Sequence, residues 1–384
     1  MQGPARRPFA REEQAHLSGK ESDQSGEDSR QADLRAEIDR LDREIQALVN
    51  RRAAQVLEVA RLKETNGGPF YRPEREAQIL QRVAERNEGP FPEDDMVRIF
   101  REIMSSCLAL ERRLRVAYLG PEASFTHAAV QVHFGHAVEE VPVATIGEVF
   151  RAVDADQADY GVVPIENSTE GAVNATLDNL RQSPLQVCGE VAMRVEHHLM
   201  SHADSIAGVE RLYLHPQTRA QCREWLTAHM IGAEWVEMPS NAEAARRAAA
   251  EPSAAAVAGA AAADHYGLPI LAHGIEDDPE NTTRFVVVGK EAAGPSGNDK
   301  TSILVSGPNR PGSLLQMLEP FSEGAVNLTK IVSRPAPEAL WDYVFFLDLE
   351  GHCQDEAVSQ ALEGVRARGG AVKVLGCYPR ADSH

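Results

Sequence analysis

The sequence predicts a multidomain protein with three segments of different fold class: all-helical, then α/β, then a short α+β segment. The chain has 384 residues, enough for two or three domains that each bury a core. Apolar residues recur at helical spacing across residues 31–115, whereas short apolar runs alternate with helical stretches from Arg115 onward. Residues 301–384 follow the order strand, helix, strand, strand, helix, strand, which is typical of a ferredoxin-like fold.

Composition excludes several classes of protein. Hydrophobic residues make up 43% and charged residues 25% of the chain, as in ordinary globular proteins. We expect no membrane partner, because no run of 18 apolar residues occurs, and a cytoplasmic location, because the N-terminus lacks an apolar signal core. A net charge of −19 disfavours nucleic acid as a partner. No Walker A or G-x-G-x-x-G motif occurs, so we expect no cofactor.

The cysteines and histidines favour neither a disulfide framework nor a metal site. Five cysteines are an odd number and contain no C-x-x-C pair, so we expect reduced thiols in a cytoplasm. His133 and His136 are three residues apart but have no acidic or sulfur partner at ligand spacing. We therefore expect no metal.

The N-terminal part divides into a polar tail and a helical segment. Residues 1–30 are rich in Glu, Ser, Gly and Gln, and we expect a disordered tail. Three helices follow, over about 32–65, from Pro73 to about 87, and over about 93–113. Three helices of such unequal length cannot form a compact monomeric core. We therefore expect the long helix to pack against a second copy, giving at least a homodimer.

Charged residues interrupt the apolar stripes of these helices. Arg52 and Lys63 continue the stripe of the first helix and lie about 16 Å apart on one face. Glu76 and Glu111 lie on the apolar faces of the second and third helices. Each charge alone has a simple explanation, either a position near a helix end or a side chain that reaches outward to water. Together they indicate a ligand with two carboxylates bound between helices, since Arg binds carboxylates through two hydrogen bonds.

The pattern from Leu34 to Arg52, followed by Lys63 and by YRPERE at Tyr71–Glu76, resembles the all-helical chorismate mutases. With the later segments, residues 31–384 resemble the bifunctional chorismate mutase–prephenate dehydratase family. The resemblance implies that Arg52, and Arg35 of the partner subunit, clamp the carboxylates of chorismate. It also implies that Lys63 donates to the ether oxygen, that Glu76 accepts from the ring hydroxyl, and that Arg72 and Arg75 border the pocket.

Two positions on the third helix depart from the family pattern. Cys107 stands where Ser is frequent, and Glu111 stands where Gln is frequent; both are expected to face the substrate. A Gln amide can always donate a hydrogen bond to the ether oxygen, whereas Glu111 donates only when it is protonated.

The middle segment carries four motifs: LGPEASFTH (119–127), VVPIENSTEGAVN (162–174), HPQ (215–217) and NTTRF (281–285). Asn167, Ser168 and Thr169 either cap a following helix or mark a helix N-terminus that holds an anion. Thr283 and Arg284 offer a hydroxyl and a cation at the start of a strand. The Ala-rich stretch 242–263 predicts two helices, and residues 290–300 predict a linker.

These motifs resemble prephenate dehydratase, which implies a two-lobed α/β domain over 116–290, similar to periplasmic binding proteins. The lobes would be 116–192 with 274–290, and 193–273. The resemblance implies that Thr283 is catalytic. Ser124, Asn167, Ser168, Thr169 and Arg284 would bind prephenate. A Thr hydroxyl is a weak acid, so it relays a proton or positions the leaving group. Ala123 stands where a Gly is common.

The last segment, 300–384, resembles the ACT regulatory domain, which implies phenylalanine as an effector. NRPGSLLQML (309–318) and VSRP (332–335) carry the resemblance, although Val332 replaces the usual Glu. The expected effector-binding residues are Asn309, Gly312, Ser313, Leu314, Leu315, Ser333 and Arg334.

The expected function is therefore a bifunctional enzyme of phenylalanine biosynthesis. It rearranges chorismate to prephenate and converts prephenate to phenylpyruvate, with phenylalanine as a feedback inhibitor. Two alternatives remain open: an enzyme with only one live activity, and a solute-sensing binding protein with a dimerising coiled coil. A coiled coil disfavours charges such as Arg52 on its apolar seam. Incubation with chorismate, followed by assay for phenylpyruvate, separates the three.

Overall fold

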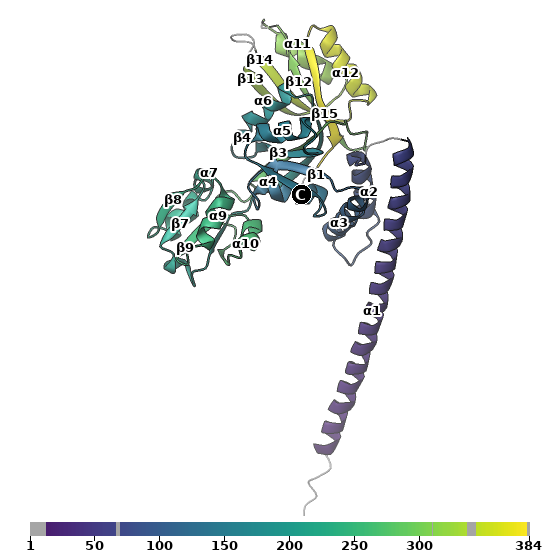
Figure 1. The fold of residues 1–384 in the computed structure, drawn as a ribbon, viewed down its shortest axis with the longest axis vertical. Coiled ribbons are helices and arrows are strands. Elements are labelled where there is room, and N and C mark those ends of the chain that lie inside the picture. Colours follow the sequence, from purple (N-terminus) through teal and green to yellow (C-terminus); the bar gives the residue numbers. More distant parts are fainter. Residues whose placement is uncertain (1–12, 67–69, 309, 336–342, 382–384) are drawn as a thin grey trace, which may run out of the picture. The chain divides into compact units, whose positions relative to one another are not determined.

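The computed structural model describes residues 13–66, 70–308, 310–335 and 343–381. These residues fall into two compact units, Met1–Asn66 and Gly67–His384, and each is described by itself (Figure 1). Within the described residues, no helix combines the length and the apolar character that a membrane span needs.

The first unit is the single helix α1, Glu13–Asn66. The expected disordered tail is wrong for residues 13–30, which continue the helix; residues 1–12 lie outside the described part. Glu, Gln and Ala are good helix formers, and single glycines at 19 and 26 weaken a helix without ending it. The apolar stripe of α1 is exposed within this chain, with Ile45 and Leu48 each 59% accessible.

Two further helices open the second unit. α2 spans Pro73–Glu85 and α3 spans Glu93–Glu111, within two residues of the expected bounds. Pro73 occupies the first turn of α2, where no backbone donor is needed. The two helices pack against each other, and the preceding Tyr71 enters an apolar cluster with Phe134 and Tyr160 of the next domain.

The α/β domain has two sheets, as the predicted two lobes require. The first lobe has strand order β2-β1-β3-β11-β5, with β4 paired to β3. Its chain leaves through β5 and returns through β11, which inserts between β3 and β5 in antiparallel register. Its strands are β1 Arg115–Leu119, β2 Glu139–Val143, β3 Tyr160–Asn167, β4 Gly171–Ala172, β5 Gln186–Arg194 and β11 Thr282–Gly289. Its helices are α4 Phe125–Phe134, α5 Ile146–Asp154 and α6 Asn174–Gln182.

The second lobe has strand order β10-β6-β9-β7-β8. Its strands are β6 His198–Ser201, β7 Arg211–Leu214, β8 Glu234–Glu237, β9 Ala254–Ala258 and β10 Ile270–Ala272. Its helices are α7 Pro216–Gln221, α8 Arg223–His229, α9 Asn241–Ala249 and α10 Ala260–Tyr266, with a 3-10 turn η1 at Ile206–Gly208.

The prediction of two helices over 242–263 is incomplete, because a strand separates them. Residues 254–258, Ala-Ala-Ala-Val-Ala, form the central strand β9 and are entirely buried. Their helix propensity is overridden by burial between β6 and β7 and beneath α9. Small side chains allow α9 to approach the sheet closely, since Ala244, Ala245 and Ala248 are also buried.

The third domain has the predicted β-α-β-β-α-β order and strand order β13-β14-β12-β15. Its helices α11 and α12 lie side by side (Figure 1). The opposite sheet face packs on the first lobe, where Phe346 and Tyr378 join the lobe's core. The strands are β12 Asp299–Ser306, β13 Leu328–Pro335, β14 Tyr343–Glu350 and β15 Ala371–Pro379. The helices are α11 Ser313–Glu323 and α12 Glu356–Ala367.

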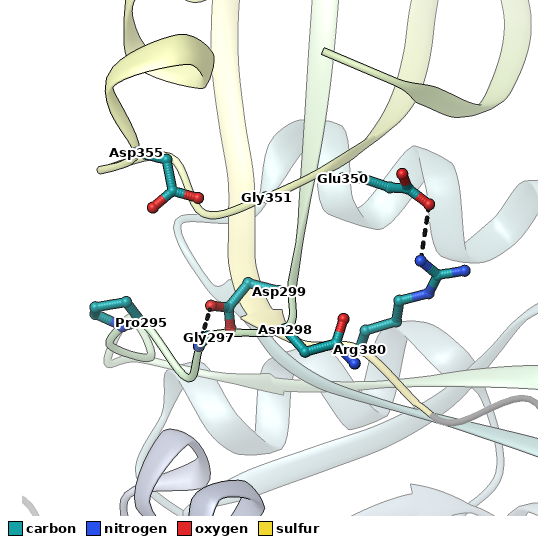
Figure 2. Close-up of a pocket in the computed structure, with 8 residues that line it drawn as sticks. All are labelled: Pro295, Gly297, Asn298, Asp299, Glu350, Gly351, Asp355 and Arg380. Atoms are coloured by element: carbon teal, nitrogen blue, oxygen red, sulfur yellow. Dashed lines mark hydrogen bonds and ion pairs between the residues drawn. The ribbon is translucent and has the colours of Figure 1, made fainter. Parts of the chain in front are cut away.

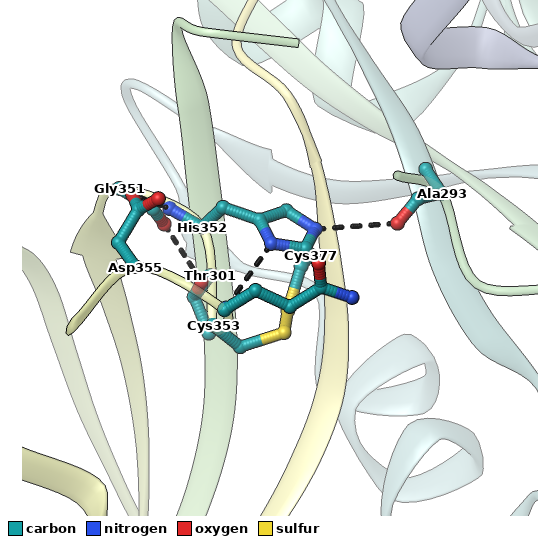
Figure 3. Close-up of a disulfide and its surroundings, with 8 residues drawn as sticks. Ala293, Thr301, Gly351, His352, Cys353, Asp355 and Cys377 are labelled. Atoms are coloured by element: carbon teal, nitrogen blue, oxygen red, sulfur yellow. Dashed lines mark hydrogen bonds between the residues drawn. A yellow bond between two sulfur atoms is a disulfide. The ribbon is translucent and has the colours of Figure 1, made fainter. Parts of the chain in front are cut away.

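One expectation about the cysteines is wrong. Cys353 and Cys377 form a disulfide across 24 positions of the chain, with their Cα atoms 6.1 Å apart (Figure 3). The odd count of five did not exclude such a pair, which the ferredoxin-like fold brings together beside β15. Cys107, Cys188 and Cys222 are free and buried.

Candidate active sites

Two neighbouring strands of the first lobe bring Thr283 and Asn167 together. β3 and β11 are antiparallel, and Thr283 of β11 lies directly opposite Asn167 at the end of β3. The Asn167 amide donates hydrogen bonds of 2.9 Å to the Thr283 hydroxyl and to the side-chain Oδ1 of Asn281. Asn167 is 8% exposed, so water does not compete for these bonds. The pairing explains how two motifs separated by more than 100 residues form one site.

The loop after Asn167 is a side-chain-stabilised turn and not a helix start. Asn167 Oδ1 accepts from the backbone N of Thr169 and Glu170, each at 3.1 Å, and from the Thr169 hydroxyl at 2.6 Å. Helix α6 begins only at Asn174 and has no side-chain cap. Neither the expected cap nor the expected anion-binding helix N-terminus is therefore present at residues 167–169. The loop instead holds the Asn167 amide in one orientation.

Ser168 ties this loop to β11. Its hydroxyl accepts from Thr282 N at 3.0 Å and donates to Asn281 Oδ1 at 3.4 Å. Its backbone N donates to Thr282 O at 2.9 Å. The structure thus brings Ser168, Thr169 and Asn167 together with Thr283, as the sequence predicts.

Arg284 is not brought to this site. Adjacent residues of a strand point to opposite faces, so Arg284 faces the third domain while Thr283 faces the turn at Asn167. Its guanidinium contacts Glu166 at 3.2 Å and Asp348 of β14 at 2.9 Å. Although burial opposes its charge, Asp348 and other nearby acidic groups raise the pKa of Arg284. This geometry makes Arg284 an ion-pair partner between domains, and the expectation that Arg284 binds substrate stays a prediction.

Ser124 lies at the N-terminus of α4. Its hydroxyl accepts from His127 N at 3.2 Å, which makes it the N-cap. The preceding Ala123 has φ of 60°, a left-handed conformation that favours Gly, the residue common there in the family pattern. Ala123 N donates to His127 Nδ1 at 2.9 Å, and this bond helps hold the loop in that conformation.

Three residues near Thr283 were missed by the sequence analysis. Asn281 is 1% exposed and accepts from Asn167; His197 is 1% exposed and lies 2.9 Å from the half-buried Gln221. The motif NTTRF contains Asn281, so its place could have been noticed. His197 and Gln221 carry no such signal, because they lie in different segments of the second lobe and Gln221 meets Thr169 only where the two lobes come together.

The residues expected to act on chorismate are divided between the two units. On α1, Arg35 is exposed and Arg52 is half-buried, whereas the side chain of Lys63 lies outside the described residues. On the second unit, Arg72 precedes α2, and Arg72 and Arg75 are exposed. The two α3 residues in this group are Cys107, which is 4% exposed, and Glu111, which ends the helix.

Glu76 has the most perturbed carboxyl group of this set. Burial raises the pKa of Glu76 to about 7, against the opposing influence of Arg101 and a hydrogen bond from Tyr71. Tyr71 also contacts His133 Nε2 of α4 at 3.2 Å. Burial and Arg101 lower the pKa of His133 to about 3, so this imidazole is neutral. Glu76 is thus connected through Tyr71 to the α/β domain.

The expected effector residues lie at two places in the third domain. Gly312 adopts φ of 82° and precedes α11, Ser313 donates to Pro308 O at 2.6 Å, and Leu315 is 71% exposed. On β13, Ser333 is exposed, whereas Arg334 points to the first lobe and pairs with Asp178 of α6 at 2.9 Å. Leu314 is 37% exposed, and Asn309 lies outside the described residues.

Two polar features of the third domain do not form a metal centre. His352 lies beside Cys353 and Cys377, but the sulfurs are bonded to each other (Figure 3). Both ring nitrogens of His352 are engaged, Nδ1 by Gln354 N and Nε2 by Ala293 O. Figure 2 shows a small pocket with Asp299, Glu350 and Asp355 on its wall. Ser296 and Gly297 donate to Asp299, and Arg380 donates to Glu350, so these two acids are satisfied within the protein.

Three family models match the chain in the order of its domains. Residues 34–112 match chorismate mutase type II, residues 116–293 match prephenate dehydratase, and residues 301–367 match the ACT domain. The matched ranges agree with the helical, α/β and ferredoxin-like parts of the structure.

Similar bifunctional proteins align with most of the chain. The chain is 49% identical to a bifunctional chorismate mutase/prephenate dehydratase of Stutzerimonas stutzeri and 47% identical to one of Pseudomonas aeruginosa. Each match covers 91% of this chain and 97% of the relative. A crystal structure of prephenate dehydratase from Arthrobacter aurescens, in complex with L-Phe, superposes with a TM-score of 0.65. It has 34% identity over 71% of this chain and 91% of that one.

Proposed function

The chain belongs to the family of bifunctional chorismate mutase/prephenate dehydratases, and from this premise we propose which residues carry each reaction. The enzyme rearranges chorismate to prephenate and then converts prephenate to phenylpyruvate, with release of carbon dioxide and water. Phenylalanine acts as its feedback effector through the ACT domain.

For the dehydratase reaction, Thr283 relays a proton to the leaving hydroxyl: it donates its own hydroxyl proton and takes a proton back from water as the hydroxyl departs. Asn167 Nδ2 donates to Thr283 Oγ1 at 2.9 Å, so this oxygen accepts from Asn167 and its own proton is left to donate outward. As the ring carboxylate leaves as carbon dioxide, its bonding electrons enter the ring and expel the hydroxyl, which departs as water. The hydrogen bond between Asn167 and Thr283 is the observation that carries this assignment.

Asn167, Ser168 and Thr169 form the polar wall beside Thr283, and Ser124 contributes from the start of α4. Asn281 joins this wall, because its side-chain Oδ1 accepts from Asn167 and Ser168. Arg284 fixes β11 against the ACT domain through its contact with Asp348.

For the mutase reaction, Arg52 and the partner subunit's Arg35 hold the two carboxylates of chorismate. Lys63 and Glu111 face the ether oxygen, Glu76 accepts from the ring hydroxyl, and Arg72, Arg75 and Cys107 border the pocket. The rearrangement is unimolecular, so restraint and electrostatic stabilisation suffice and no nucleophile is needed.

The mutase assignment requires a second copy of the chain. Residues of the α1 stripe such as Leu34, Ile38 and Ile45 are between 55% and 59% exposed within one chain. A helix with so many exposed apolar residues needs a partner, and a second α1 supplies a matching stripe. We infer a homodimer in which each long helix serves both sites.

Phenylalanine binding is assigned to the loop before α11 and to β13, through Asn309, Gly312, Ser313, Leu314, Leu315 and Ser333. β13 is an edge strand, since among the described strands it pairs only with β14. Lys330 and Arg334 of this strand pair with Glu166 and Asp178 of the first lobe at 3.0 and 2.9 Å. These contacts support a direct route from the effector strand to the loop at Asn167. We therefore assign Arg334 to transmission of the phenylalanine signal from β13 to the first lobe.

We infer that the enzyme works in the cytoplasm. Three buried free thiols, at Cys107, Cys188 and Cys222, fit a reducing compartment. The Cys353–Cys377 bond is the feature that fits this inference least.

Two substitutions test the dehydratase assignment with prephenate as substrate. Thr283→Ala should lower kcat by at least about 100-fold, in the range expected for loss of a general acid. Thr282→Ala is the matched control, because its hydroxyl donates to Glu280 O and makes no contact with Asn167; its rate should stay within about threefold. Thermal unfolding, compared with wild type, reports folding of the dehydratase domain in both. Retention of dehydratase activity by Thr283→Ala would remove the assignment.

A further inference from the structure

His197 is a buried histidine whose ring makes one hydrogen bond, to the side chain of Gln221. It lies between β5 and β6, is 1% exposed, and packs edge-on against Phe125 at 5.6 Å between ring centroids. Its Nε2 lies 2.9 Å from Gln221 Oε1, an acceptor, so Nε2 carries the proton. Burial lowers the pKa of His197, so the ring is neutral and Nδ1 is unprotonated. Nδ1 is buried and has no hydrogen-bond partner among the described residues.

The Gln221 amide accepts a hydrogen bond from His197 and donates one to Thr169 of the other lobe. Because its oxygen accepts from His197, its nitrogen faces Thr169 and donates to that hydroxyl at 3.4 Å. This is the longest hydrogen bond of the series, and active-site hydrogen bonds of this length commonly tighten when substrate binds. Gln221 belongs to α7 of the second lobe, whereas Thr169 follows β3 of the first.

Thr169 and Asn167 also each donate a hydrogen bond to the next residue toward Thr283. The Thr169 hydroxyl donates to Asn167 Oδ1 at 2.6 Å, and Asn167 Nδ2 donates to Thr283 Oγ1 at 2.9 Å. The Asn167 amide cannot reverse, because two backbone donors also point at its oxygen. Every group from His197 to Thr283 therefore donates in one direction, and the Thr283 proton remains free at the end of the series.

We propose that His197 is a positioning residue of the dehydratase, whose Nε2–H orients the Gln221 amide so that Gln221 donates to Thr169 beside the Asn167–Thr283 pair. If His197 carried its proton on Nδ1, Nε2 would accept, and the Gln221 amide would turn its nitrogen toward His197. Gln221 Oε1 would then compete with Asn167 for the Thr169 proton. Since Gln221 lies on the other lobe, its hydrogen bond to Thr169 also ties the loop that carries Asn167 to the second lobe.

The proposal rests on the assigned role of Thr283, and its test separates the two. His197→Phe keeps an aromatic ring but removes the donor, whereas His197→Gln can place an amide N–H near the position of Nε2. His197→Phe should lower dehydratase kcat by about 10–100-fold with KM for prephenate changed less than about threefold. His197→Gln should recover most of that loss. Thermal unfolding reports folding of the α/β domain, and the mutase activity of the same protein should not change.

Gln221→Glu provides a second variant that keeps shape and volume. A carboxylate accepts from His197 but cannot donate to Thr169, so it should lower kcat to a similar extent. The double variant His197→Phe/Gln221→Glu should be no slower than the slower single variant, because both changes break one series.

Three results would overturn the proposal. One is a kcat for His197→Phe within twofold of wild type. Another is an equal loss in His197→Gln and His197→Phe when both unfold at the Tm of wild type. The third is full dehydratase activity in Gln221→Glu, which decides the matter even if the His197 variants do not fold. A failure of the Thr283 assignment appears separately, as dehydratase activity in Thr283→Ala.

Discussion

The carboxyl group of Glu76 makes the stability of the folded protein depend on pH. Its pKa is raised from 4.5 in the unfolded chain to about 7 in the folded protein by burial. The folded protein therefore holds the Glu76 proton more tightly, and the contribution of Glu76 to stability is greatest below about pH 4.5. This contribution falls as pH rises toward 7 and then levels off.

Replacement of Glu76 by Gln should remove this pH-dependent loss. A shift of this size corresponds to roughly 3 kcal/mol as an upper figure, since each pKa unit is about 1.4 kcal/mol. We expect Glu76→Gln to raise Tm at pH 8 and to flatten the fall in Tm between pH 4.5 and 7. Thermal unfolding across this range, with Glu74→Gln on the same helix as control, measures the effect. A Glu76→Gln profile parallel to that of wild type would contradict it.

Individual residues also show which parts of the site a sequence motif predicts and which it does not. The T-R-F motif identified Thr283 and Arg284 as one functional pair, but strand geometry separates them to opposite faces. A motif specifies neighbours along the chain and does not reveal which face each occupies until the strand is known. His197 and Gln221 were missed for a related reason, because their partners come from distant segments.

The ion pair between Arg284 of the first lobe and Asp348 of the ACT domain predicts how stability responds to pH and to substitution. Burial opposes ionisation of Asp348, but Arg284 and a hydrogen bond from Ser302 hold its pKa below the usual value. This ion pair therefore stabilises the protein at neutral pH, and the stabilisation is lost as pH falls through the lowered pKa.

Asp348→Asn should destabilise the protein by about 2–4 kcal/mol, because it leaves Arg284 buried with a weaker partner. The matched control is Asp178→Asn, whose carboxylate is 51% exposed beside Arg334 and should matter by less than about 1 kcal/mol. Urea unfolding at pH 7 compares them. An equal loss of unfolding free energy in the two variants would contradict the larger contribution of the buried pair.

At the scale of elements, β15 and β5 join the ACT domain to the first lobe at very close range. A Cβ atom at Gly376 of β15 would lie 2.0 Å from the backbone O of Val187. No side chain can move aside there, because the clash is with backbone. Only Gly permits this approach of the two strands.

Gly376→Ala should therefore push the ACT domain away from the lobe. We expect a lower Tm and weaker inhibition of the dehydratase by phenylalanine, with mutase activity retained. Gly232→Ala is the control, since a Cβ there meets nothing within 4 Å. Unchanged phenylalanine inhibition in a folded Gly376→Ala protein would contradict a regulatory role for this contact.

Elements with strong periodicity were predicted well, and those set by tertiary context were not. The helices α2 and α3 and the order of the ACT strands follow directly from apolar spacing. Residues 254–258 are Ala-rich and favour a helix in isolation, yet they form β9 because they fill the centre of a sheet. The extension of α1 to Glu13 was missed because a polar composition does not distinguish a helix from a disordered tail.

For the whole molecule, the domain order predicts that the mutase can be separated from the rest. A fragment of residues 31–115 contains the helices assigned to that site, including the exposed stripe of α1. It should form a dimer by sedimentation and convert chorismate to prephenate, but make no phenylpyruvate. A fragment that is helical and active as a monomer would show that Arg35 of a partner is not required.

The central claim is that one chain carries two separate sites that share prephenate as a free intermediate. Arg52→Ala should abolish the first reaction and Thr283→Ala the second. Each variant is incubated with chorismate at neutral pH, alone and mixed in equal amounts, and prephenate and phenylpyruvate are followed by chromatography against an enzyme-free control. We predict accumulation of prephenate with Thr283→Ala alone, no product above the control with Arg52→Ala alone, and phenylpyruvate from the mixture. Phenylpyruvate from Thr283→Ala alone, or none from the mixture, would contradict the account.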